Sequence, residues 1–352
     1  MLISNLRINT QRLVKNLNHL SLIGKLPDKG VSRLALTDED RQSRDQLVMW
    51  MKETGLDVRI DQVGNIFGTR AGLVNQRPVM LGSHIDTVIG AGRYDGCYGV
   101  LAALEVIKVL NEKKIETKSP VVVASFANEE GVRYQPGMLG SSVFSGALAV
   151  SSALNITGVD GSIYGAELEQ IGYAGDMRPG DIKPGAYLEL HIEQGPILDR
   201  DKIQLGVVEG VVGISWWEVT VTGSANHAGT TPIEMRRDAG LAAAKLVERI
   251  REIAVKVGGD QRSTCGMIKY FPNAINVIPG KVVMTVDLRN SSETGLADAE
   301  RMLLARSREI EVSDGVTIDV KLLEKSLPLS LTIVLFRPWK KHPNLLAFTP
   351  GE

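Results

Sequence analysis

The chain has 352 residues, enough for two domains that each have a hydrophobic core. Its 40 Lys and Arg residues nearly balance 41 Asp and Glu residues, for a net charge of −1. The chain therefore has no overall positive charge that would attract nucleic acid or an anionic membrane surface. The 43% hydrophobic content is typical of a soluble globular protein, and two cysteines are too few for a disulfide framework. Residues 1–20 lack the apolar segment of a secretory signal, so we expect a cytoplasmic protein with no membrane or nucleic-acid partner.

The N-terminal part of the chain alternates predicted helices and strands. Apolar residues at helical spacing predict helices, and short runs rich in β-branched residues between turns predict strands. In chain order these are helices at 12–23 and 38–54, a strand and turn pair at 58–69, a strand at 78–82, a helix at 96–110, and strands at 121–126 and 186–190. Strands that alternate with helices, with polar residues at strand ends, predict an α/β domain whose open mixed sheet has flanking helices.

The pattern changes after about residue 208. The predicted elements beyond it are strands at 211–222, 262–270 and 281–288 and helices at 239–255 and 293–310. Two helices against a mostly antiparallel sheet form a compact α+β unit. We therefore predict a catalytic domain at 1–208 and an inserted satellite domain at 209–323, with 324–352 as an atypical remnant of the first domain.

Short motifs in the first half of the chain carry side chains that bind metal ions. They are Leu81-Gly82-Ser83-His84-Ile85-Asp86-Thr87, Tyr94-Asp95-Gly96, Asn128-Glu129-Glu130-Gly131 and Glu189-Leu190-His191-Ile192-Glu193. Taken singly, His84 and Asp95 are more often a buried histidine and a helix cap. Together with the other imidazole and carboxylates at predicted strand ends, they favour a metal centre. The motifs contain no cysteine, which favours an open catalytic site over a closed structural zinc site.

Two of these motifs also suggest how the site works. Asp86 is close enough in sequence to hold the second ring nitrogen of His84, as carboxylates beside histidine ligands commonly do. Glu129 and Glu130 are adjacent, so they cannot point the same way from one strand end. One can bind a metal ion while the other accepts a proton from water. A Glu-Glu pair is usually a solvated surface, but this pair follows a predicted buried strand.

The satellite domain contains a second group of polar motifs. They are Gly223-Ser224-Ala225-Asn226-His227-Ala228-Gly229-Thr230-Thr231-Pro232, Asn273-Ala274-Ile275-Asn276-Val277-Ile278-Pro279-Gly280 and Asp287-Leu288-Arg289. A histidine among small residues and hydroxyls can polarise a substrate carbonyl, or it can belong to a turn that caps a helix. Arg289 suits bidentate capture of a carboxylate, or it is an ordinary exposed strand arginine. The residues alone leave both alternatives open.

The motifs resemble those of the dinuclear-metal amidohydrolase and metallopeptidase superfamily that includes aminoacylases and carboxypeptidase G. More narrowly, they are similar to a branch of N-carbamoyl-L-amino-acid hydrolases, allantoate amidohydrolases and yeast-type β-ureidopropionases. The resemblance covers about residues 10–325 and is most specific at 188–195 and 227–232.

This resemblance implies a role for each motif residue. His84 and His191 would hold one metal ion and Glu130 the other, with Asp95 between them and Glu129 as general base. The implied substrate-binding residues are Gln194, His227, Asn276 and Arg289. His227 would serve the active site of the other subunit, which implies a homodimer formed through the satellite domain.

The implied reaction is hydrolysis of a carbamoyl C–N bond in a small ureido or carbamoyl acid, with release of an amino acid, carbon dioxide and ammonia. The implied cofactors are two divalent ions per subunit, and histidine with carboxylate ligands suits Zn, Mn, Co or Ni. His227 would stabilise the oxyanion of the tetrahedral intermediate, and Arg289 would hold the substrate carboxylate. Allantoate, N-carbamoyl amino acids and ureidopropionate all fit, because each has a carbamoyl head and a carboxylate.

The chain departs from this branch after about residue 323. Members of the branch continue to a Gly-His-Asp segment whose histidine completes the second metal site. Here the last histidine is His342, in Lys340-Lys341-His342-Pro343, and we do not expect it to replace that ligand. The tail resembles a shifted reading frame or an unrelated end, which predicts an impaired second metal site. Two alternatives follow: an inactive truncated homologue that acts only as a dimerisation partner, and a related aminoacylase or peptidase.

Overall fold

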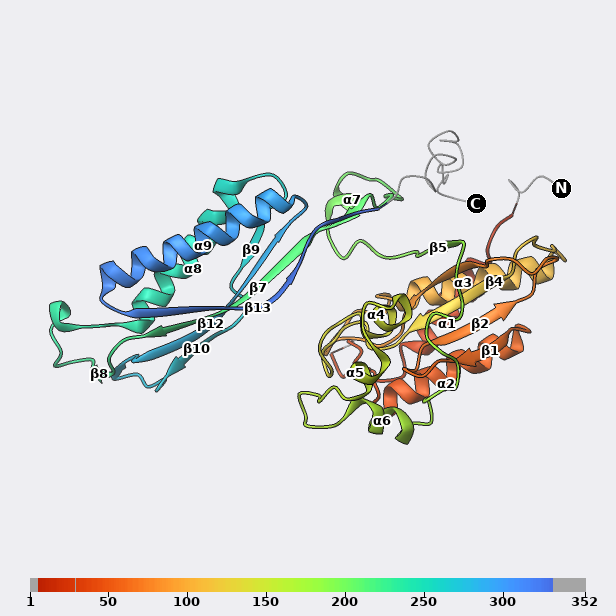
Figure 1. Cartoon of the computed structure of the whole chain (residues 1–352), viewed down its shortest axis with the longest axis horizontal. Coiled ribbons are helices and arrows are strands. Elements are labelled where there is room, and N and C mark those ends of the chain that lie inside the picture. Colours follow the sequence, from red (N-terminus) through yellow and green to blue (C-terminus); the bar gives the residue numbers. More distant parts are fainter. Residues whose placement is uncertain (1–5, 29, 332–352) are drawn as a thin grey trace. The chain divides into compact units, whose positions relative to one another are not determined.

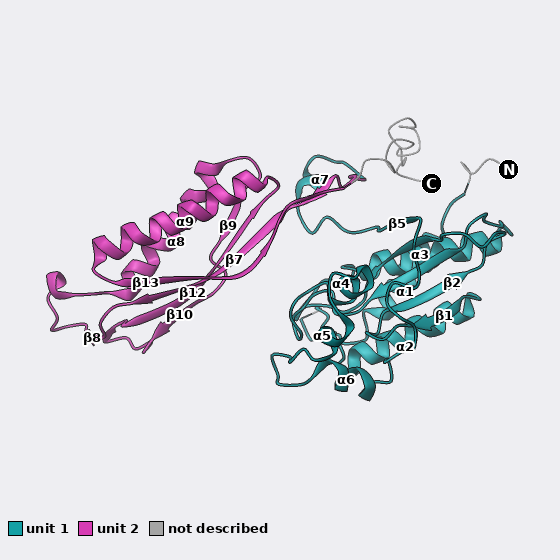
Figure 2. Cartoon of the chain, viewed as in Figure 1, with its two compact units in different colours: residues 1–204 teal, residues 205–352 magenta. Residues whose placement is uncertain are grey.

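The chain forms two compact units, Met1–Gln204 and Leu205–Glu352 (Figure 2). The computed structural model describes residues 6–28 and 30–331. The boundary between the units lies a few residues before the predicted one at 208. Strand β13 (Thr317–Ser326) continues past residue 323, where the satellite domain was predicted to end. The assignment of 324–352 to the catalytic domain stays a prediction, because most of that stretch lies outside the described residues.

The first unit is built on a mixed sheet with the strand order β1-β2-β4-β3-β5 (Figure 1). Its strands are β1 (Asp57–Ile60), β2 (Ile66–Arg70), β3 (Val79–His84), β4 (Val121–Phe126) and β5 (Ala186–Leu188). β3 runs parallel to both β4 and β5, whereas β1 and β2 are antiparallel to their neighbours. Every residue of β4 is buried, so the β-branched run at 121–126 forms the fully covered strand that the sequence predicted.

Helices flank this sheet, as predicted. They are α1 (Thr10–Leu20), α2 (Asp38–Glu53), α3 (Cys97–Glu112) and the short α4 (Leu139–Ser145). The unit also contains the short helices α5 (Val150–Leu154), α6 (Tyr164–Gln170) and α7 (Ile197–Arg200). The hydroxyl of Thr37 accepts the backbone N–H of Asp40, which caps α2 where the sequence predicted its start. Alternate residues of β4 join different cores. Val121 and Val123 pack with residues of α1, α2 and α3, while Val122 belongs to a smaller cluster.

The second unit is an antiparallel sheet with two long helices, which confirms the predicted α+β architecture. The strand order is β10-β12-β7-β13, and β9 also pairs with β12. The elements are β7 (Gly213–Thr222), α8 (Ala239–Val257), β9 (Arg262–Thr264), β10 (Ile268–Phe271), β12 (Lys281–Asn290), α9 (Glu293–Asp314) and β13. Buried and half-buried residues alternate along β7, and Val219 packs in one cluster with Leu246 of α8 and Leu303 of α9. The helices therefore cover one face of the sheet (Figure 1).

Two predictions for the second unit need correction. The single strand predicted at 262–270 is two strands, β9 and β10, because residues 265–267 leave the ladder between them. β13 was not predicted as a strand. The remaining small elements are β6 (Gly210–Val211), β8 (Asn226–His227), the short helix η2 (Ile233–Met235), β11 (Val277–Ile278) and β14 (Leu329–Ser330). Within 6–28 and 30–331, no helix has the length and apolar character needed to span a membrane.

Candidate metal centre

Three of the predicted ligands, His84, Asp95 and His191, meet at one edge of the first unit's sheet. Their ligand atoms all lie within 4.8 Å of one another. Oδ1 of Asp95 is 3.2 Å from Nε2 of His191 and 4.0 Å from Nε2 of His84. β3 ends at His84, and its parallel partner β5 ends shortly before His191, so the pairing brings both imidazoles to the same edge. Two imidazoles and a carboxylate at this spacing can hold a divalent cation.

Glycine at position 96 makes the approach of Asp95 to His84 possible. Gly96 has φ +60°, and a Cβ atom there would lie 2.4 Å from Nε2 of His84. Any side chain would therefore collide with the imidazole of His84. Gly99, in the first turn of α3, is equally constrained, because a Cβ atom would lie 2.9 Å from Cβ of Ser83. These two glycines therefore allow close backbone approach beside the polar motifs.

Asp86 connects His84 to the glutamate pair. Its carboxylate accepts the backbone N–H groups of Glu129 and Glu130, each at 3.2 Å. Nδ1 of His84 is 3.0 Å from the backbone oxygen of Asp86 and 3.7 Å from its Oδ1. The ring is therefore held more closely by the backbone of Asp86 than by its carboxylate, contrary to expectation. The reason is that the carboxylate, in a residue only 2% exposed, faces two amide donors.

Glu129 and Glu130 differ in the contacts that they make. Oε2 of Glu129 lies 3.5 Å from Nε2 of His84. Glu130 is not part of the three-residue ligand group. Its Oε1 is buried, and no donor among the described residues reaches it. A buried carboxylate oxygen without a donor is costly, and a cation would relieve that cost. The donor set therefore fits a metal site that extends from His84, Asp95 and His191 towards Glu130.

Negative charge accumulates at this site. Burial raises the pKa of the Glu130 carboxyl to about 7, and burial also raises the pKa of Glu129. Burial opposes a charge on His84, but the carboxylates of Asp86, Glu129 and Glu130 outweigh it and raise the pKa of the imidazole. Each group thus resists the charge state that metal ligation requires. This is the behaviour expected of ligands arranged around a missing positive charge.

Gln194 contacts Asp95, one of the predicted ligands. Its side-chain amide donates to Oδ2 of Asp95, the oxygen that does not face the imidazoles. The backbone of Gln194 has φ +52°, an uncommon conformation for a residue other than glycine. Its contact with substrate stays a prediction.

Sequence reasoning missed a side-chain link between the end of β3 and the segment that follows β5. Oε1 of Glu189 accepts the hydroxyl of Ser83 at 2.5 Å, and its Oε2 accepts the hydroxyl of Tyr187 at 2.7 Å. Ser83 directly precedes His84, and Glu189 lies two residues before His191. The link therefore ties the two strand ends that position the imidazoles. The available signal was a hydroxyl and a carboxylate next to the predicted ligands, at the ends of two strands predicted for the same sheet.

The other predicted substrate-binding residues belong to the second unit. His227 pairs with Val277 between β8 and β11, and the backbone oxygen of Asn276 accepts the N–H of Ala228 at 2.9 Å, so His227 and Asn276 are neighbours. Arg289, on β12, forms an ion pair with Asp287. Their contacts with substrate stay predictions. His342 lies outside the described residues.

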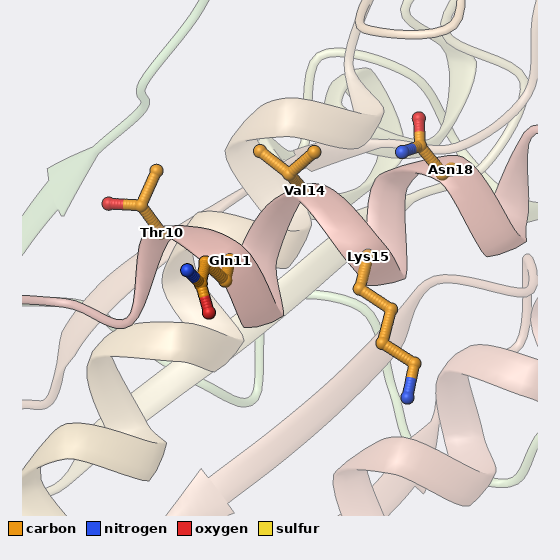
Figure 3. Close-up of a pocket in the computed structure, with 5 residues that line it drawn as sticks. All are labelled: Thr10, Gln11, Val14, Lys15 and Asn18. Carbon is orange, nitrogen blue, oxygen red and sulfur yellow. The ribbon is translucent and has the colours of Figure 1, made fainter.

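A surface pocket of about 470 Å³ lies along α1 and is separate from these residues (Figure 3). Its described lining consists of Thr10, Gln11, Val14, Lys15 and Asn18. These side chains offer a hydroxyl, two amides and an ammonium group, but no carboxylate or imidazole. The pocket on α1 is therefore not the metal centre.

An open α/β sheet with imidazoles and carboxylates converging at one edge, next to a further glutamate, is typical of a metal-dependent hydrolase. The chain belongs to peptidase family M20/M25/M40, whose match covers residues 80–302. Members of this family generally use two metal ions. The family resemblance inferred from the sequence is thereby confirmed.

Individual relatives give the same result. The chain is 40% identical over 334 residues to an N-carbamoyl-L-amino-acid amidohydrolase of Rhizobium meliloti, covering 91% of this chain and 80% of that protein. It is 34% identical over 331 residues to an allantoate amidohydrolase of Escherichia coli strain K12, covering 92% and 80%. The crystal structure of a hydantoinase/carbamoylase family amidase from Burkholderia multivorans superimposes with a TM-score of 0.88 at 40% identity, covering 96% of this chain and 82% of that one.

Proposed function

We propose that the protein hydrolyses the carbamoyl C–N bond of an N-carbamoyl amino acid or of a similar ureido acid such as allantoate. The observation that carries this proposal is the convergence of His84, Asp95 and His191, with Glu129 3.5 Å from His84. Relatives named as N-carbamoyl-L-amino-acid and allantoate amidohydrolases support the substrate class. The reaction consumes water and yields the amino acid, carbon dioxide and ammonia.

We infer sites for two divalent ions, Zn, Mn, Co or Ni, of which the second would be impaired because its C-terminal histidine ligand is not expected in this chain. His84 and His191 would hold one, Glu130 the other, and Asp95 would lie between them. Such ions, when bound, lower the pKa of water and polarise a carbonyl group. Glu129 would accept the proton of the attacking water at its carboxylate and return it to the leaving nitrogen. Burial, which raises the pKa of Glu129, brings this carboxylate closer to the range in which a base is effective near neutral pH.

The second unit would recognise the substrate. Nδ1 of His227 accepts the N–H of Gly229 at 3.1 Å, so this nitrogen is unprotonated in the neutral ring and Nε2 carries the hydrogen. A proton on Nε2 suits donation to a developing oxyanion. We infer that His227 serves the active site of a partner copy, in a homodimer formed through this unit. In support, the side chains of Ile233, Met235 and Ile275, in the loops beside β8 and β11, are exposed and apolar.

The test is ammonia release from N-carbamoyl-L-amino acids by the full chain with added Mn²⁺, Co²⁺ or Zn²⁺. Glu129→Gln is expected to keep its metal, measured by mass spectrometry, and to lose about 10²- to 10⁴-fold in turnover. Glu116→Gln removes an exposed carboxylate elsewhere in the same unit and is expected to behave as wild type. Full turnover by metal-loaded Glu129→Gln would refute the role of Glu129 as base.

Two other outcomes would change the assignment. Turnover of N-acyl amino acids or dipeptides, without turnover of carbamoyl substrates, would identify an aminoacylase or peptidase. A metal content near one ion per chain with no turnover of any of these compounds would support a role limited to dimerisation. Sedimentation of the full chain tests the homodimer directly.

A further inference from the structure

Two arginines lie directly opposite each other on the sheet of the second unit. The register of β12 and β9 pairs Arg289 with Arg262. Side chains of directly opposed residues in antiparallel strands point to the same face, with Cβ atoms about 4.5–5.5 Å apart. Like charges in this position are destabilising. The pair therefore lowers the stability of the sheet, which favours a binding function over a structural one.

Both arginines are on the face of the sheet opposite the helices. Val286 and Leu288 of β12 are buried in the cluster that contains α8 and α9. Side chains alternate along a strand, so Asp287 and Arg289 point to the other face. The side chain of Arg289 is 41% exposed, and Arg262 is exposed as well. A ligand can therefore reach both guanidinium groups.

Asp287 fixes the orientation of the Arg289 guanidinium. Nε of Arg289 donates to Oδ1 and Oδ2 of Asp287 at 3.1 and 3.0 Å, and Nη2 lies 2.9 Å from Oδ2. This contact uses the Nε–Nη2 edge of the planar group. Nη1 has no partner among the described residues, so the Nη1–Nη2 edge remains for a second carboxylate. A guanidinium binds a carboxylate on such an edge through two parallel hydrogen bonds.

The backbone beside both arginines is held by a buried amide pair. The side-chain nitrogen of Asn290 donates to Oε1 of Gln261 at 2.9 Å, and Nε2 of Gln261 donates to the backbone oxygen of Arg262 at 2.7 Å. Asn290 and Gln261 are each only 4% exposed. Within the described part of the chain, the side chain of Arg262 makes one hydrogen bond, from Nη1 to the backbone oxygen of Gln261 at 3.2 Å. Its remaining donors are available to a ligand.

We propose that Arg262 and Arg289 together bind the substrate carboxylate, and that Asp287 is the positioning residue that presents the Nη1–Nη2 edge of Arg289. This inference rests on the proposed function, in which Arg289 meets a carboxylate, and it adds the second cation and the residue that orients the first. Two guanidinium groups with one carboxylate leave a net positive charge. The subsite therefore selects carbamoyl acids over the corresponding neutral amides.

The test measures this selection as a ratio of two dissociation constants. Full-length, Mn²⁺-loaded protein carrying Glu129→Gln, which prevents turnover, is titrated by calorimetry with N-carbamoyl-L-alanine and with its carboxamide. The acid is expected to bind at least about tenfold more tightly, as for a charge-assisted hydrogen-bonded pair. Arg289→Ala should abolish most of this preference, and Arg262→Ala and Asp287→Asn should each reduce it about three- to tenfold. Arg262→Lys, which keeps the charge without the planar fork, should give an intermediate value.

Matched controls come from the same sheet face. Lys269, opposite Val283, and Asp319, opposite Thr220, carry charges there and form no ion pair within the described part of the chain. Lys269→Ala and Asp319→Asn are expected to keep the full preference. Thermal melts followed by circular dichroism confirm that each variant is folded. A general loss of structure would weaken binding of acid and carboxamide alike, so a change in the ratio is not a stability effect.

Three results would overturn the inference. They are equal binding of acid and carboxamide by the starting protein, an unchanged preference in Arg262→Ala, and tighter acid binding in Asp287→Asn, which would make Asp287 a competitor. The proposed reaction is judged separately by ammonia release from the wild-type chain. An intact acid preference without ammonia release would refute the reaction and support the subsite.

Discussion

The buried carboxylate of Asp86 allows a quantitative test of the metal centre's geometry. Asp86→Ala would leave the backbone N–H groups of Glu129 and Glu130 without their acceptor, inside a site where Asp86 is only 2% exposed. A hydrogen bond to a charged group contributes about 1.5–3 kcal/mol, and the 3.2 Å distances favour the lower figure. The two bonds together therefore contribute about 3 kcal/mol. For a domain of this size we expect the melting temperature to fall by about 6–12 °C.

The assay is thermal unfolding of the metal-free full chain, followed by calorimetric titration with Mn²⁺. Asp86→Ala should weaken metal binding as well as stability, because the glutamate backbone loses its anchor. Asp57→Ala removes an exposed carboxylate from β1 and should change the unfolding free energy by less than about 0.5 kcal/mol. If Asp86→Ala behaved like Asp57→Ala in both measurements, the glutamate pair would not depend on Asp86 and the reasoning would be wrong.

Further predictions concern the ligands, the link between the strands and the second unit. In the metal-free protein the pKa of Glu130 is raised to about 7 and that of His84 is also raised, so both hold protons that a metal ion displaces. Metal affinity measured by calorimetry should therefore rise between about pH 6 and pH 8. A metal affinity that does not change with pH would contradict the raised pKa values of Glu130 and His84. Ser83→Ala removes a hydroxyl donor from Glu189 and should weaken Mn²⁺ binding in the same titration. An unchanged affinity would show that the Ser83–Glu189 hydrogen bond does not help to position the two imidazoles. Leu246→Ala opens a cavity in the second unit and should cost about 2–5 kcal/mol in urea unfolding, while metal content, measured as a control, stays the same.

Elements with strong local signals were predicted well. The strand at 121–126 matches β4 at both ends, because its β-branched residues are buried on both faces and no other structure suits them. α2 begins at Asp38 as predicted, where Thr37 caps it, since capping depends only on neighbouring residues. β13 was missed although polar and apolar residues alternate from 317 to 322, because the adjacent Leu322 and Leu323 break the pattern where the strand has a bulge. The short helices α4 to α7 are too brief to show helical periodicity.

As with the fold, some features of the candidate site could be predicted from the sequence and others could not. Residue types and strand-end positions were sufficient to indicate His84, Asp95 and His191, and these three converge. The contacts of Asp86 and Glu189 could not be inferred, because they depend on which strands pair and in which register. The Asp287–Arg289 ion pair was accessible in principle, since residues two apart on a strand share a face. Its significance depends on the cross-strand neighbour of Arg289, which only the register reveals.

The negative charge at the metal centre should make the site destabilising until a cation binds. Folding raises the pKa of Glu130 from 4.5 to about 7, so the folded protein holds this proton more tightly than the unfolded chain does. The resulting loss of stability is absent below about pH 4.5, grows as the pH rises, and is complete above about pH 7. Glu130→Gln removes the charge and keeps the shape. We therefore expect it to raise the melting temperature of the metal-free protein at about pH 8 and to leave it nearly unchanged at about pH 4.5, while Mn²⁺ stabilises the variant less than the wild type. A variant that is less stable than wild type at the higher pH would show that the Glu130 carboxylate is satisfied without metal, and that the accumulated charge is not what prepares this site for a cation.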